Sequence, residues 1–117
     1  MVHIDVLYFE GCPSWQHAWN DLSTVLADTG VVATVRLVDV MSLDERGRRG
    51  FGGSPSIHVD GHDLEGYEGE GVLACRRYDE NEGRGWPSMT LLRARLTAAP
   101  DSGTARATEV GRGRGQR

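Results

Sequence analysis

The chain has 117 residues, with 13 basic and 17 acidic side chains and a formal net charge of −4. This length suits one domain, and the acidic balance argues against nucleic acid as the main partner, because phosphate contacts need clustered basic residues. No apolar run approaches the roughly 20 residues that span a bilayer, and no basic and apolar leader opens the sequence. We therefore expect no membrane partner and a cytoplasmic location, where its two cysteines stay mostly reduced.

The composition divides the chain into two parts. Residues 1–99 contain the apolar periodicity and predict one domain, whereas residues 100–117 end in GRGRGQR and show none. The second part holds four arginines against Asp101 and Glu109, so residues 1–99 carry a net charge of −6. Residues 100–117 therefore predict a disordered tail rich in arginine and glycine.

The first two elements are a strand and an amphipathic helix. His3–Phe9 (HIDVLYF) reads as a buried strand, apolar on both faces. Ser14–Thr29 is typical of a helix, because its apolar residues fall at helical spacing on one face: Trp15, Ala18, Trp19, Leu22, Val25 and Leu26. Pro13 suits the first helical turn, and Gly30 is typical of a helix C-terminus.

A second strand and a short helix come next. Val31–Val40 is rich in β-branched residues and predicts a strand, which after a helix implies parallel pairing with the first strand. Ser42–Arg49 predicts a short helix, with Ser42 as its N-cap and Glu45 completing a capping box.

The remaining elements are a hairpin, an extended stretch and a final helix. Ser56–Asp60 alternates as a strand does, and Asp60-Gly61 predicts a tight turn into His62–Leu64. Leu73–Tyr78 is either a short strand or an extended arm, and Pro87–Ala98 predicts the last helix. The order β-α-β-α-β-β-α gives an α/β fold with a mixed four-stranded sheet flanked by helices.

Cys12 is the residue with the clearest chemical potential. It follows Gly11 at the end of the first strand and precedes Pro13 at the start of the first helix. Unpaired backbone N–H groups and the positive end of the helix dipole favour a thiolate at such a position. The sequence therefore predicts a candidate nucleophile at Cys12, with a packed and inert cysteine as the alternative.

Three motifs together resemble the thioredoxin-like superfamily over roughly residues 3–98. They are Gly11-Cys12-Pro13-Ser14-Trp15 between strand and helix, Gly53-Ser54-Pro55-Ser56-Ile57 before the third strand, and the Asp60-Gly61 hairpin. The chain looks most similar to small, atypical members of this superfamily whose site reads Cys-Pro-x-Trp.

The resemblance implies a set of site residues. Cys12 matches the nucleophilic cysteine, Pro55 matches a cis-proline that faces it, and the Ser54 backbone matches the position that pairs with an extended substrate. Pro13 and Trp15 complete the expected substrate-binding residues, with Trp15 placed to shape which partner thiols approach.

The chain departs from the dithiol pattern, because Trp15 stands where the second cysteine of a Cys-x-x-Cys motif would be. Two chemistries stay open. Cys12 can act as a monothiol with glutathione as co-substrate, or Cys75 can resolve the mixed disulfide from elsewhere in the fold. The expected partners are protein or low-molecular-weight thiols and disulfides, with no bound cofactor.

Other interpretations of the cysteines also stay open. Cys75 can be a buried structural residue, or Arg76 or Arg77 can lower its pKa. Cys12 and Cys75 with a histidine can hold a soft metal ion, although no ligand spacing typical of zinc is present, so we expect no dedicated metal site. The alternative function is a thioredoxin-fold module that binds protein or a soft metal without catalysis.

Overall fold

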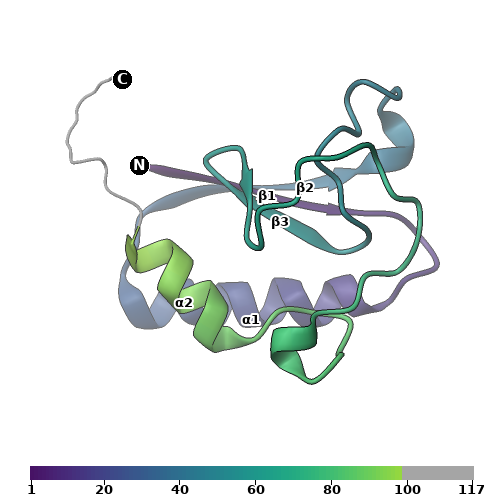
Figure 1. The fold of residues 1–117 in the computed structure, drawn as a ribbon. Helices are drawn as coiled ribbons and strands as arrows, with labels where there is room; N and C mark the ends of the chain where they lie inside the picture. The colour runs from purple at the N-terminus through teal and green to yellow at the C-terminus, as the bar shows by residue number, and fades with distance from the viewer. Residues whose placement is uncertain (99–117) are drawn as a thin grey trace.

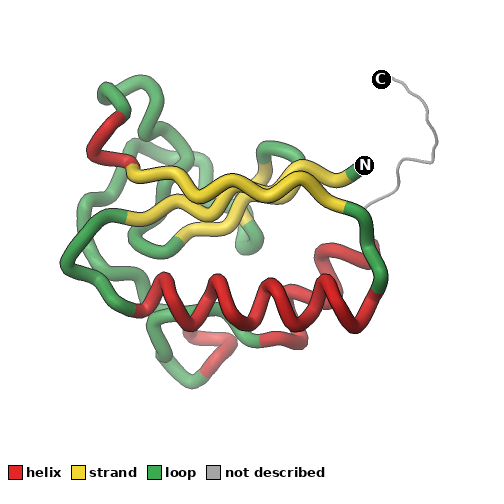
Figure 2. The backbone as a smooth tube through the Cα atoms, turned by 180° about the vertical axis from the view of Figure 1, so that it is seen from behind, coloured by secondary structure: helices red, strands yellow, loops and turns green. Residues whose placement is uncertain are grey.

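The computed structural model describes residues 1–98. They form one sheet with both α-helices against the same face (Figures 1 and 2). The elements are β1 (Val2–Tyr8), α1 (Ser14–Thr29), β2 (Ala33–Asp39), the 3-10 helix η1 (Val40–Ser42), β3 (Ser56–Val59), β4 (His62–Asp63), the 3-10 helix η2 (Asp79–Asn81) and α2 (Met89–Ala98). The tail predicted at residues 100–117 lies outside the described residues.

The sheet has four strands in the order β2-β1-β3-β4. β1 pairs in parallel with β2 and antiparallel with β3, and β3 pairs antiparallel with β4. The prediction of an α/β fold with a mixed four-stranded sheet is confirmed. None of the described helices has the length and apolar character needed to cross a membrane.

α1 has the bounds that the sequence predicts. Pro13 precedes it with φ −66°, and Gly30 ends it in the left-handed region at φ 71°, with the Gly30 N–H donating to the Leu26 carbonyl. Glycine adopts this conformation without the penalty that a Cβ brings. The buried stripe of Ala18, Leu22 and Val25 points to the sheet.

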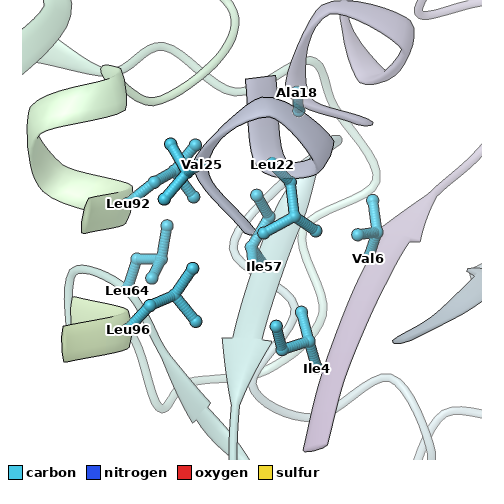
Figure 3. Close-up of a cluster of buried hydrophobic side chains, with 9 residues drawn as sticks. All are labelled: Ile4, Val6, Ala18, Leu22, Val25, Ile57, Leu64, Leu92 and Leu96. Carbon is cyan, nitrogen blue, oxygen red and sulfur yellow. The ribbon is translucent and has the colours of Figure 1, made fainter. Parts of the chain in front are cut away.

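The main core lies between the sheet and the two helices (Figure 3). Its buried members are Ile4, Val6, Ala18, Leu22, Val25, Ile57, Leu64, Leu92 and Leu96. Burying side chains of this size provides about 1.5–3 kcal/mol each relative to exposure. The core therefore holds β1 and β3 against α1, and it thereby fixes the loop with Cys12 between β1 and α1.

The far face of β1 differs from the prediction of a strand that is apolar on both faces. Side chains alternate along a strand, and Asp5 on this face accepts hydrogen bonds from Arg36 at 2.9 and 3.2 Å. Leu7 joins a smaller cluster with Val40 and Phe51. The far face is thus apolar only near the carboxyl end of β1.

The helix predicted at Ser42–Arg49 is wrong. After η1 the chain makes a series of turns, in which Asp44 Oδ1 accepts from the Gly47 N–H at 2.8 Å. Ser42 Oγ donates to the Asp39 carbonyl at 2.6 Å instead of capping a helix. Short polar side chains that bond to nearby backbone compete with helix formation, and Gly47 adds a further penalty.

The hairpin agrees with the prediction. Asp60 and Gly61 have φ 51° and 87°, as a tight type I′ turn requires, and β3 pairs with β4 through His58 and Asp63. No regular strand forms at Leu73–Tyr78: residues 71–78, called the arm from here on, bend at Ala74 and make isolated bridges at Cys75 and Tyr78.

Candidate functional site

The structure joins Cys12 and Cys75 in a disulfide across a separation of 63 residues. Their Cα atoms lie 6.1 Å apart, within the range that disulfides span. Cys12 comes from the loop between β1 and α1, and Cys75 comes from the arm. The sequence left the distance between the two cysteines open, and the fold brings them together.

The two halves of the disulfide differ in exposure. Cys12 is only 2% exposed, whereas Cys75 is an exposed residue. The sequence predicts a reactive thiol at Cys12, and the structure places that residue in the protein interior. The outer half of the pair is the cysteine from the arm.

The Cys12 sulfur has two neighbours that carry partial charge. It lies before the first turn of α1, where the helix dipole places partial positive charge. Cys12 Sγ also lies 3.4 Å from the Ser54 carbonyl oxygen, which carries partial negative charge. The resemblance places the Ser54 backbone beside Cys12, but it does not predict that the Ser54 carbonyl faces the sulfur.

Ser54 and Pro55 are both buried beside the disulfide, and the peptide bond between them is cis. The Ser54 N–H donates to the Ala74 carbonyl at 2.9 Å, and the Ser54 carbonyl accepts from the Arg76 N–H at 2.9 Å. These two bonds form a parallel bridge between Ser54 and Cys75. The arm therefore occupies the backbone groups of Ser54 that the resemblance assigns to an extended substrate.

Arg76 fixes the arm through a network of hydrogen bonds and ion pairs. Its guanidinium donates to both carboxylate oxygens of Asp63 at 2.7 and 2.9 Å, to Ser56 Oγ at 2.9 Å and to Glu65 at 3.1 Å. The Arg76 side chain is 8% exposed and the Asp63 side chain 0% exposed. The positive charge of Arg76 is therefore paired with the carboxylate of Asp63. Arg76 is thus a positioning residue for Cys75.

The pKa of the Asp63 carboxyl lies below its ordinary value. Burial raises this pKa, but the hydrogen bonds and charge of Arg76, with the backbone N–H groups of Glu65 and Tyr67, lower it further than burial raises it. An aspartate that accepts several hydrogen bonds stays ionised in this way. The buried carboxylate is therefore a stable anchor at neutral pH.

Tyr78 fastens the other end of the arm. Its hydroxyl donates to the Pro55 carbonyl at 2.6 Å, and the Arg76 guanidinium carbon lies 4.6 Å from the centre of its ring. Burial, with the nearby carboxylates, raises the pKa of Tyr78 above its ordinary value despite the charge of Arg76. Tyr78 and Arg76 together hold Cys75 opposite Cys12.

The other predicted binding residues lie around the start of α1. Pro13 is exposed, and the half-buried Trp15 packs its ring against Tyr8 with 4.8 Å between centroids. A role for Trp15 in shaping the approach of a partner thiol stays a prediction. The fold brings four of the predicted site residues together, because the bridge joins Ser54 to Cys75 and the disulfide joins Cys75 to Cys12. The fourth residue, Pro55, follows Ser54 directly.

The roles of Asp63 and Tyr78 were not predicted, and the sequence left open whether Arg76 or Arg77 turns toward the sulfur of Cys75. One signal was present: Arg76 and Tyr78 are two residues apart in an extended stretch, so they share one side while Cys75 takes the other. The partner of Arg76 had no local signal, because Asp63 is 13 residues away.

Within residues 1–98, no group of three or more histidine, cysteine or acidic side chains could hold a metal ion. Comparisons of the chain with family models, with curated proteins and with solved structures give no match.

Proposed function

We propose that this protein is a thiol–disulfide redox protein with a thioredoxin-like fold, and that Cys12 and Cys75 are its working pair. The observation that carries the proposal is the disulfide between the start of α1 and the arm. The strand order β2-β1-β3-β4 and the position of Ser54 and Pro55 beside the sulfurs support the thioredoxin-like comparison.

A pair of cysteines within reach of each other favours resolution inside one chain over a lasting adduct. In the oxidised protein one external thiolate attacks the disulfide, forms a mixed disulfide and releases the other cysteine. A second external thiol then displaces the first, so two thiols are oxidised to a disulfide and the protein gains two cysteine thiols. The reverse sequence reduces an external disulfide, and glutathione can serve as co-substrate in either direction.

The experiment is to incubate the reduced protein with oxidised glutathione and measure its intact mass and its non-reducing peptide map. We expect the wild-type chain to lose two hydrogens and to give a cross-linked peptide pair containing Cys12 and Cys75. Cys75→Ser and Cys12→Ser cannot close this bond, so each should keep a glutathione adduct on its remaining thiol if that thiol reacts.

Two results would change the assignment. A glutathione adduct that persists on the wild-type chain would favour the monothiol route. A wild-type chain that neither closes its disulfide nor reopens it with added reduced glutathione would contradict redox function.

The second candidate is a non-catalytic binding module in which the disulfide only holds the arm in place. It is favoured by the irregular structure of residues 64–88 between β4 and α2, all of them described, in which η2 is the only helical turn. A disulfide that survives excess reduced glutathione in the folded protein would support this candidate.

A further inference from the structure

We propose, resting on the proposed function, that the pair exchanges with external low-molecular-weight thiols through Cys75, and that Cys12 is the inner sulfur that leaves. This order is the reverse of the one that the first helix and its cysteine predict. It follows from exposure, from the direction of attack and from the hydrogen bonds of Ser54.

Exposure favours Cys75 as the point of attack. Cys12 is 2% exposed and Cys75 is exposed. A thiolate attacks a disulfide in line with the bond that breaks, and the rate depends on access to the attacked sulfur. In-line attack on Cys75 comes from the side of its sulfur opposite Cys12, at an exposed residue, whereas in-line attack on Cys12 must reach the sulfur of a residue that is only 2% exposed.

The bonds of Ser54 restrict the kind of partner. Its N–H and its carbonyl are taken by Ala74 and Arg76. The contacts of Arg76 with Asp63 and of Tyr78 with Pro55 involve neither cysteine, so we expect the arm to keep its place after reduction. An extended peptide therefore cannot pair with Ser54, and a small thiol that needs only the Cys75 sulfur fits the site.

Exchange with an external thiol proceeds in two displacements. The external thiolate forms a sulfur–sulfur bond to Cys75 as the bond between Cys75 and Cys12 breaks, and the electron pair leaves on Cys12. Cys12 then takes up a proton from solvent and can donate its S–H to the Ser54 carbonyl, 3.4 Å from the sulfur. A second thiol attacks the small-molecule sulfur of the adduct and releases Cys75.

The test uses the full chain with each cysteine alone, as Cys12→Ser and Cys75→Ser. Both reduced variants are mixed with oxidised glutathione at neutral pH, and the rate of adduct formation is followed by mass spectrometry. We expect Cys12→Ser, which keeps Cys75, to react at least about tenfold faster, because exchange depends on access to the thiol. In guanidinium chloride the two rates should become similar, which shows that the fold causes the difference.

The outcomes separate this inference from the proposed function. Equal rates in the folded proteins, or faster reaction of Cys75→Ser, would overturn the role of Cys75 while leaving a wild-type redox pair intact. If the wild-type disulfide does not exchange with glutathione at all, the proposed function fails and this inference fails with it.

Discussion

Arg76 follows Cys75 directly, yet its guanidinium binds Asp63 on the other side of the arm. Removing one partner of a buried ion pair costs about 3–5 kcal/mol, because the other charge is left buried and unpaired. The chain offers a contrast in Arg36 and Asp5, whose side chains are 69% and 32% exposed. Exposed pairs of this kind contribute about 0–1 kcal/mol.

Asp63→Asn should therefore lower the free energy of unfolding by about 3 kcal/mol, and Asp5→Asn by less than about 1 kcal/mol. Urea unfolding of the oxidised proteins measures both values. Because Asp63 holds Arg76 and so the arm, Asp63→Asn should also slow closure of the Cys12–Cys75 disulfide. Equal effects of the two substitutions would show that Asp63 does not anchor the arm.

The lowered pKa of Asp63 predicts a dependence of stability on pH. In the unfolded chain the pKa of an aspartate is about 3.9. A carboxyl whose pKa is lower in the folded state stabilises the fold fully at pH values above the unfolded-state pKa. The contribution is lost as the pH falls through the lower folded-state pKa. Wild-type protein should thus lose stability below about pH 4 more steeply than Asp63→Asn in urea unfolding at a series of pH values. Parallel curves for the two proteins would be inconsistent with an ionised Asp63.

At the scale of the elements, the arm depends on its close approach to the loop before β3. Gly53 has φ 110°, and a Cβ placed there would lie 3.0 Å from Arg76 Cβ and 3.1 Å from the Ala74 carbonyl oxygen. Gly61 is also left-handed at φ 87°, but a Cβ there would meet nothing within 4 Å. A substitution at Gly61 therefore tests backbone strain alone, whereas a substitution at Gly53 tests strain together with contact with the arm.

Gly53→Ala should destabilise the fold by about 1–3 kcal/mol and slow disulfide closure, because the added methyl group displaces the arm. Gly61→Ala should show backbone strain alone and close its disulfide at the wild-type rate. The rate is measured by quenched alkylation of the reduced proteins after addition of oxidised glutathione. Wild-type closure in Gly53→Ala would argue against the close packing of arm and loop.

Most of the helices and strands could be predicted from the sequence. β1, α1, β2 and the Asp60-Gly61 hairpin follow from local periodicity and turn residues, and their bounds agree with the structure within one or two residues. The helix prediction for Ser42–Arg49 is wrong because a capping pattern does not reveal a competing hydrogen bond, here the one that the Asp44 side chain accepts from the Gly47 N–H. Local signals predict an element well only when no nearby side chain competes for its backbone.

At the scale of the whole molecule, the site depends on contacts between distant segments. Cys12 and Cys75 are 63 residues apart, and neither periodicity nor spacing specifies their separation in space. The sequence identified both cysteines together with Ser54 and Pro55, but not the contacts of Asp63 and Tyr78 that hold the arm. Nor could it predict that Cys12 is the buried half and Cys75 the exposed half.

The most direct test of the account is an equilibrium titration of the folded protein in mixtures of reduced and oxidised glutathione. The fraction of the Cys12–Cys75 disulfide is read by alkylation and peptide mapping. We predict full, reversible interconversion of dithiol and disulfide, without a lasting glutathione adduct on the wild-type chain. A disulfide that stays closed in every folded sample and opens only in denaturant would contradict a redox role.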